Sequence, residues 1–433
     1  MCRPFASLRA GSKGRRYLEA RTLADCEKRM NFDEIAQLEK QVLIPTYDRL
    51  PILAVRGEGC YLYDDQGKKY LDFLGGLAVN SLGYAHPEIL AALRDESETL
   101  LHTSNLLYHP YQGPLAKKLT ALSGMDRAFF ANSGTEAIDG TLKLVRAYAR
   151  RRLESCEILA VENSFHGRTF GALSATWPEK YRKPFEPLVP GIRFVRLNDA
   201  KHLRESFTPR LGAVLLEVIQ GEGGVVELSE EFLKTAEELC HANGALLVCD
   251  EIQCGLGRTG RFFAFSKFGL RPDIVVVAKP LAAGLPLAAI LAREEVAQAF
   301  SPGMHGTTFG GGPLQCRLAL KVLEILERPG FLEHVRDVGG YFRAQLEALR
   351  SEFAVLEEVR GDGLMLAAQL SVPGKNLVRQ GLEAGVIFNC TQEKVLRFLP
   401  PLIIERSHVD ELMAALKPIL GACSAGLQVG KGS

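Results

Sequence analysis

Residues 245–250 read Ala-Leu-Leu-Val-Cys-Asp, and residues 274–279 read Ile-Val-Val-Val-Ala-Lys. Short runs rich in Val, Ile and Leu predict strands that are buried on both faces, as in a parallel sheet. Each run ends in a charged residue, which is Asp250 in the first and Lys279 in the second. Because open α/β sheets bind ligands at the carboxyl ends of their strands, the two runs predict a functional site at that edge.

An acid and a lysine at one sheet edge are the pair that pyridoxal phosphate (PLP) chemistry needs. The lysine forms a Schiff base with the cofactor aldehyde, and the acid keeps the pyridine nitrogen protonated so that the ring accepts electrons. Taken alone, the two runs favour a plainer interpretation, in which Asp250 is a helix cap or turn residue and Lys279 is a solvated strand end. The rest of the chain has to decide between these interpretations.

Strand-like and helix-like segments alternate on both sides of the two runs. Further candidate strands are residues 128–131, 158–161, 192–195, 213–218 and 287–291. This alternation predicts an α/β domain with a mostly parallel sheet. From about Arg317 a helical pattern leads into a smaller α+β segment, with candidate strands at 363–370 and 395–398.

We expect five segments along the chain. Residues 1–29 form an extension outside the fold, 30–80 and 326–420 form a small domain, 81–325 form a large domain, and 421–433 form a flexible tail. In the extension five basic residues precede Glu19, the first acidic residue, which resembles the composition of an organelle transit peptide. An upstream extension before an internal start at Met30 is the alternative. A cytoplasmic location is expected, with an organelle matrix as the alternative.

The composition is that of an ordinary globular protein. The chain has 433 residues, 47% hydrophobic and 24% charged, with a formal net charge of +1, so no broad field attracts nucleic acid or an anionic membrane. No apolar stretch approaches the roughly 18 residues that span a bilayer. The ten cysteines lack zinc-site spacing, so we expect neither a metal site nor a disulfide framework.

Two short motifs at predicted strand ends suit a phosphorylated ring. Residues 132–137 read Asn-Ser-Gly-Thr-Glu-Ala and open a helical stretch, so they fit either a phosphate site or a plain capped helix. Residues 165–169 read Phe-His-Gly-Arg-Thr. Phe165 could lie flat on a ring and Arg168 could bind a carboxylate, although a solvated surface loop is the alternative.

Four further segments are ambiguous when read singly. Glu217 leads into the glycine-rich residues 220–224, which suit a site wall or an ordinary turn. Residues 305–312 suit a phosphate loop or a flexible connector, and Arg397 lies in a predicted strand. Residues 255–260 match GxGxxG, the fingerprint of nicotinamide-dependent oxidoreductases. They do not directly follow a strand and lead into no convincing helix, so that class is disfavoured.

Taken together, these segments resemble the class III (ω-amino) aminotransferases of PLP fold type I, and most closely the acetylornithine aminotransferases. The resemblance runs from about residue 43 to residue 420 and includes, in order, SGTEA, FHGRT, QGEGG, DEIQ, AK, HGTTFGG and RFLPPL. It implies fold type I, a homodimer with shared active sites, and PLP as cofactor. Pro280 and Gly312 depart from the family pattern.

The resemblance implies a role for each cofactor-binding residue. Lys279 would be the Schiff-base lysine and would carry the proton, Asp250 would pair with the pyridinium nitrogen, and Phe165 would stack on the ring. The remaining contacts would come from Gly134 and Thr135 at the phosphate, Glu251, Ile252 and Gln253 beside the ring, and Thr308 at the phosphate in the partner subunit.

The resemblance also implies how substrates bind. Arg168 would bind the carboxylate distal to the reacting amine, Thr307 would contact the substrate, and Arg397 would bind the α-carboxylate of glutamate or 2-oxoglutarate. Glu217 would neutralise Arg397 when the donor has no carboxylate there.

The implied activity is transfer of the terminal amine of N-acetylornithine to 2-oxoglutarate, an EC 2.6.1 reaction of arginine biosynthesis. Ornithine, succinylornithine, 4-aminobutyrate and a carrier-linked diamine are alternative donors.

Overall fold

The computed structural model describes residues 30–429, which divide into two compact units. The first unit holds residues 30–55 and 63–68. Its helix α1 (Phe32–Val42) starts with a capping box, in which Asn31 Oδ1 accepts from the Glu34 backbone N–H at 3.0 Å and Glu34 Oε2 accepts from the Asn31 N–H at 2.9 Å. These two bonds satisfy backbone donors that a helix start leaves free.

The second unit, residues 56–62 and 69–429, contains a seven-stranded sheet in the order β4-β12-β11-β10-β7-β5-β6. Strand β10 is parallel to β11 and β7, and β5 is parallel to β7 and β6, whereas β12 is antiparallel to β11 and β4. The predicted mostly parallel sheet is therefore confirmed. The strands are β4 (Arg127–Ala131), β5 (Glu157–Val161), β6 (Ile192–Val195), β7 (Leu211–Leu216), β10 (Leu246–Asp250), β11 (Ile274–Val277) and β12 (Ala288–Ala292).

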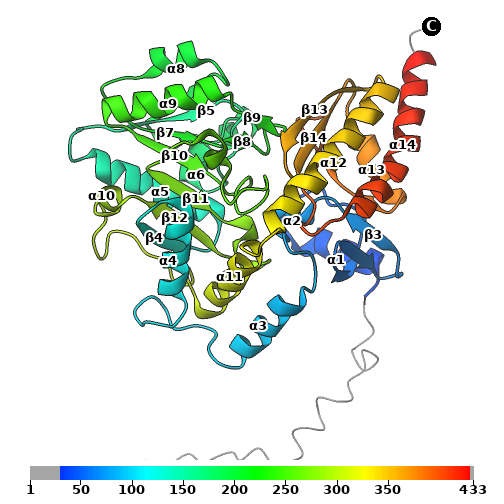
Figure 1. The fold of residues 1–433 in the computed structure, drawn as a ribbon, viewed down its shortest axis with the longest axis horizontal. Helices are drawn as coiled ribbons and strands as arrows, with labels where there is room; N and C mark the ends of the chain where they lie inside the picture. Colours follow the sequence, from blue (N-terminus) through cyan, green and yellow to red (C-terminus); the bar gives the residue numbers. More distant parts are fainter. Residues whose placement is uncertain (1–29, 430–433) are drawn as a thin grey trace, which may run out of the picture. The chain divides into compact units, whose positions relative to one another are not determined.

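Helices cover both faces of this sheet (Figure 1). In β10, Leu247 and Cys249 pack into the core that includes residues of α9 (Glu230–Asn243), whereas Leu246 and Val248 pack into the core that includes residues of α5 (Gly134–Ala149). The alternation follows from the two-residue period of a strand. A sheet buried on both faces explains why the strand runs are apolar throughout.

A second, antiparallel sheet has the order β13-β14-β17-β16, and α12 packs against β13. Its strands are β13 (Leu356–Asp362), β14 (Met365–Leu370), β16 (Asn389–Thr391) and β17 (Val395–Phe398), and its helices are α12 (Phe331–Glu352), α13 (Lys375–Glu383) and α14 (Arg406–Val429). Strand β15 (Val386–Ile387) pairs in parallel with β3 (Lys69–Asp72).

The remaining elements are short or connect the sheets. They are β1 (Ala54–Glu58), β2 (Tyr61–Asp64), α2 (Gly75–Ala78), α3 (Pro87–Ser97), α4 (Gln112–Ser123), α6 (Phe170–Ser174), α7 (Glu179–Arg182), η2 (Lys183–Phe185), α8 (Ala200–Ser206), β8 (Ile219–Gln220), β9 (Val226–Glu227), η3 (Ala264–Phe268), η4 (Lys279–Ala282), α10 (Glu294–Ala297) and α11 (Pro313–Leu326). Within residues 30–429, no helix combines the length and apolar character needed to cross a membrane.

The structure differs from the expected segments in two places. Helix α14 continues to Val429, so the expected flexible tail from residue 421 is wrong for its first nine residues. Alanine, leucine and glutamine in this stretch are good helix formers. The expectation of a flexible tail gave more weight to the glycine and serine residues between them. The expected 30–80 segment is divided between the two units. Residues 1–29, expected to lie outside the fold, and residues 430–433 fall outside the described residues.

Candidate active site

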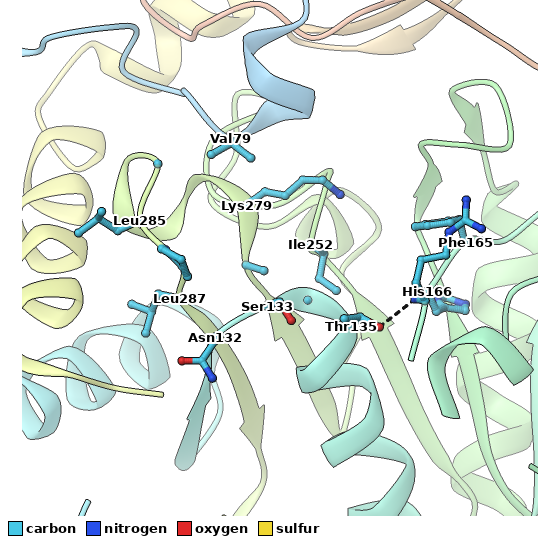
Figure 2. Close-up of a pocket in the computed structure, with 16 residues that line it drawn as sticks. Val79, Asn132, Ser133, Thr135, Phe165, His166, Ile252, Lys279, Leu285 and Leu287 are labelled. Carbon is cyan, nitrogen blue, oxygen red and sulfur yellow. Dashed lines mark hydrogen bonds between the residues drawn. The ribbon is translucent and has the colours of Figure 1, made fainter. Parts of the chain in front are cut away.

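The predicted site lies at the carboxyl edge of the central sheet. Asp250 closes β10, Lys279 follows β11 by two residues, and Phe165 follows β5 by four. Their loops surround a pocket of about 350 Å³ (Figure 2). The pocket is lined by Val79, Asn132, Ser133, Gly134, Thr135, Phe165, His166, Gly167, Arg168, Ile252, Ala278, Lys279, Gly284, Leu285, Pro286 and Leu287.

The buried carboxylate of Asp250 is held by two donors. His166 Nδ1 lies 2.7 Å from Asp250 Oδ2, and the Ile252 backbone N–H donates to Oδ1 at 3.0 Å. Asp250 is 3% exposed and His166 is 2% exposed. Both oxygens of Asp250 therefore have a hydrogen-bond partner, which fixes the orientation of its side chain. The sequence motif contained His166, but we assigned it no role.

Lys279 reaches into the pocket from the start of η4. Figure 2 shows its side chain extending towards the side where Phe165 and His166 lie. Burial lowers the pKa of Lys279, although Asp250 and Glu222 act in the opposite direction. A lowered pKa increases the share of neutral amine, which is the form that attacks an aldehyde or accepts a proton.

The start of α5 forms an anion cradle beside the lysine. Ser133 caps the helix, and its hydroxyl accepts from the Glu136 N–H at 3.4 Å. Among the described residues, the backbone N–H groups of Gly134 and Thr135 have no protein acceptor. A Cβ atom at Gly134 would lie 2.8 Å from Ile252 Cδ1, so a larger residue there would displace the side chain of Ile252. Free N–H groups at a helix start bind phosphate.

Thr135 ties this cradle to the loop that carries Phe165. Its Oγ1 accepts from the backbone N–H of Arg168 at 2.9 Å and of Thr169 at 3.0 Å. Phe165, His166 and Thr135 therefore face one pocket, as Figure 2 shows. The start of α5, Asp250 and Lys279 are suited to three groups of PLP, which are its phosphate, its ring nitrogen and its aldehyde, respectively.

Arg397 enters the site from β17 and is only 1% exposed. Its Nη1 contacts Glu222 Oε1 at 2.6 Å and Gln253 Oε1 at 3.2 Å, and its Nε donates to Asn389 Oδ1 at 3.2 Å. Burial raises the pKa of Glu222, but the charge and hydrogen bond of Arg397, together with the positive charges of Lys279 and Arg168, outweigh burial. The net pKa of Glu222 therefore lies below the ordinary value. Glu222 is therefore an ionised partner of a buried guanidinium.

This pairing corrects the expectation for Glu217. The partner of Arg397 in the structure is Glu222, whereas Glu217 accepts from the backbone N–H of Phe165 at 2.9 Å and of Gly221 at 3.0 Å. Glu217 directly follows β7 and stays at the strand end. Glu222 lies five residues farther along and is flanked by glycines, so it reaches β17. Its place between Gly221 and Gly223 is the feature of the sequence that could have identified Glu222.

The other predicted residues are only partly brought together. Ile252 lines the pocket, but Glu251 points away from it and accepts from the N–H groups of Ala264 and Phe265. Gln253 contacts Arg397, as described above. Glu222, His166 and Asn389 were not predicted as site residues.

The two threonines of the 305–312 loop lie outside the pocket lining. Thr307 Oγ1 accepts from Asn132 Nδ2 at 3.2 Å, and Asn132 does line the pocket. Thr308 is exposed and borders a separate depression with residues 102–105. A single chain therefore does not bring Thr308 to its own pocket.

The rival nicotinamide interpretation has no structural basis. Residues 255–260, which match GxGxxG, form successive turns, and the next element is the short 3-10 helix η3. The fingerprint requires a strand directly before it and a helix directly after it.

Comparisons with known proteins agree with this geometry. The family described as Aminotransferase class-III matches residues 43–420. The acetylornithine aminotransferase of Methanocaldococcus jannaschii is 46% identical over 392 residues, which cover 90% of this chain and 98% of that protein. The acetylornithine aminotransferase of Aquifex aeolicus is 48% identical over 380 residues, which cover 87% of this chain and 99% of that protein.

A solved structure extends the similarity to three dimensions. The ornithine aminotransferase of Toxoplasma gondii, crystallised in the presence of oxidised glutathione and with partial occupancy of PLP at its active site, has a TM-score of 0.88 at 31% identity. The match covers 92% of this chain and 96% of that chain.

The buried carboxyl of Glu217 predicts a pH-dependent stability. Burial raises its pKa from 4.5 to about 7, against the two N–H donors. The unfolded chain therefore ionises first, so this group's contribution to stability is present below pH 4.5 and is lost as the pH rises through about 7. We expect the free energy of unfolding of wild type, minus that of Glu217→Gln, to fall across this window in urea titrations. For the surface control Glu186→Gln, the difference in free energy of unfolding from wild type should not change with pH. If the difference for Glu217→Gln is also independent of pH, the raised pKa of Glu217 is contradicted.

Proposed function

Because this chain belongs to the class-III aminotransferase family and is a PLP-dependent aminotransferase, we propose that its amino donor is N-acetylornithine. Its terminal amine passes to 2-oxoglutarate, giving the semialdehyde and glutamate. The curated relatives at 46% and 48% identity, which the chain matches over nearly their full length, support this donor. A role in arginine biosynthesis follows from the reaction.

The Arg397–Glu222 ion pair is the observation that best supports a reaction with two different substrates. A buried guanidinium without a counter-ion is strongly unfavourable. Glu222 supplies the counter-ion while the donor occupies the site, because the reacting end of N-acetylornithine has no carboxylate. When glutamate or 2-oxoglutarate enters, its α-carboxylate replaces Glu222 on Arg397. The side chain of Glu222 is 30% exposed and that of Arg397 is 1% exposed. The side chain of Glu222 therefore has room to move, whereas that of Arg397 does not.

Bound PLP supplies an aldehyde that captures amines and a ring that accepts electrons. The N–H groups of Gly134 and Thr135 would hold its phosphate, and Phe165 would pack against its ring. Asp250, fixed by His166, holds a proton at the pyridine nitrogen. The amine of Lys279 would carry a proton from the donor carbon beside the reacting nitrogen.

Arg168 orients the far end of the donor. Its guanidinium lines the pocket and is exposed, so it is accessible to the carboxylate of N-acetylornithine. The same arginine receives the distal carboxylate of 2-oxoglutarate. Arg168 therefore acts in both halves of the reaction, whereas Arg397 acts in only one.

A homodimer completes the proposed site. Leu106, Leu107 and Tyr108 are exposed on one loop, and Phe309 is exposed on another. Asn105 joins the two loops by donating to the carbonyls of Thr307 and Gly310, at 3.2 and 3.0 Å. Exposed apolar side chains gathered in this way mark an interface. Thr308 lies on the second loop, so a partner would bring it to the other subunit's phosphate cradle.

Half-reactions test the donor. N-acetylornithine should bleach the visible absorbance of the PLP-loaded protein at the lowest concentration among N-acetylornithine, ornithine, succinylornithine and 4-aminobutyrate. Lys279→Ala should bind PLP without the visible band of wild type and transfer no amine, whereas the surface variant Lys183→Ala should behave as wild type. If 4-aminobutyrate bleaches the band and N-acetylornithine does not, the proposed donor is wrong.

Light scattering tests the dimer. The wild type should show about twice the chain mass of 47.5 kDa, and Leu106→Glu with Tyr108→Glu should shift the mass towards the monomer and weaken PLP binding. The exposed Phe185→Glu serves as the control, because Phe185 lies outside both loops. A monomeric wild type that binds PLP and is fully active would overturn the shared-site proposal.

A further inference from the structure

Arg168 is held in place by aromatic rings and not by an acid. Its Cζ lies 3.9 Å from the ring centroid of Tyr181 and 5.3 Å from that of Phe165. Among the described residues, its guanidinium has no hydrogen-bond or ion-pair partner. The other arginine of the site, Arg397, has an acid partner and two amide partners. The two arginines are therefore supported in different ways.

The stack suits an arginine that must bind a passing carboxylate. A guanidinium stacks through its flat face and donates hydrogen bonds from its edge. An acid partner would occupy that edge and neutralise the charge, so a substrate would have to displace it. An aromatic partner restrains the side chain and leaves the donors free. Restraint before binding reduces the entropy that is lost on binding.

Tyr181 is itself anchored to the loop that forms the pocket. Its ring meets the ring of Phe165 edge to face, with centroids 6.2 Å apart and an angle of 85°. Tyr181 lies on α7, and just before this helix the Trp177 N–H donates to the Ser164 carbonyl at 2.9 Å. The aromatic ring at the cofactor position and the carboxylate-binding arginine thus share one support.

We propose that Tyr181 is a positioning residue that sets the preference for substrates carrying a distal carboxylate, because its ring holds Arg168 ready to bind. This inference rests on the proposed function, in which Arg168 binds that carboxylate. The hydroxyl of Tyr181 is not needed, since the contact uses the ring face. Tyr181→Phe keeps the stack, and Tyr181→Leu removes it while filling most of the volume.

Two ligand comparisons isolate this effect in the PLP-loaded enzyme. N-acetylnorvaline has the shape and carboxylate of N-acetylornithine but no terminal amine, so its Kd, measured by calorimetry, reports binding without reaction. Putrescine is ornithine without the carboxylate, so the ratio of kcat/KM for ornithine over putrescine reports the use of the carboxylate. The PLP absorbance and the thermal midpoint of each variant report whether the site and the fold are intact.

In Tyr181→Leu, the Kd for N-acetylnorvaline should rise about fivefold and the ornithine-to-putrescine ratio should fall by a similar factor. Its kcat for ornithine at saturation should stay within twofold of wild type, and Tyr181→Phe should match wild type throughout. Equal losses for putrescine and ornithine, an unchanged Kd in Tyr181→Leu, or a loss in Tyr181→Phe would each overturn the proposal. A wild type that binds no PLP or converts no donor would instead refute the proposed function.

Discussion

The hydrogen bond between His166 Nδ1 and Asp250 Oδ2 is the interaction on which the rest of the site depends. It joins the loop after β5 to the end of β10 across the intervening strand β7, and so sets the distance between the stacking residue Phe165 and the acid. Both partners are buried, so the bond acts where charge interactions are strong. Because the second oxygen of Asp250 is occupied by the Ile252 N–H, the carboxylate has little freedom to turn away.

Two glutamates of the site make different contacts. Glu217 stays at the strand end, where it fixes the backbone of Phe165 and of Gly221. Gly221 directly precedes Glu222, so the backbone beside Glu222 is anchored, whereas the side chain of Glu222 is 30% exposed. In the proposed switch only the side chain of Glu222 would move, so the cofactor contacts would stay unchanged as the substrates alternate.

Strand runs and their charged ends were predictable because a central parallel sheet needs apolar residues on both faces. The positions of Asp250 and Lys279 follow directly from that constraint. The choice between Glu217 and Glu222 was not predictable in the same way, since it depends on the path of a glycine-flanked loop towards β17. His166 contacts Asp250 from a loop, and Tyr181 contacts Arg168 from the short helix α7. Contacts between segments far apart in the chain leave no periodic pattern in the sequence. Strand β13 was missed because its pattern of burial lacks a regular alternation.

The charge of Asp250 is the central element of this mechanism, and Asp250→Asn tests it most directly. The substitution keeps the size of the side chain and removes the negative charge. After loading with PLP, the single-turnover rate with N-acetylornithine should fall on the order of 10²–10³-fold relative to wild type, as for other lost electrostatic contacts at a reacting centre. A rate within threefold of wild type, at equal PLP occupancy, would contradict the role of the buried carboxylate.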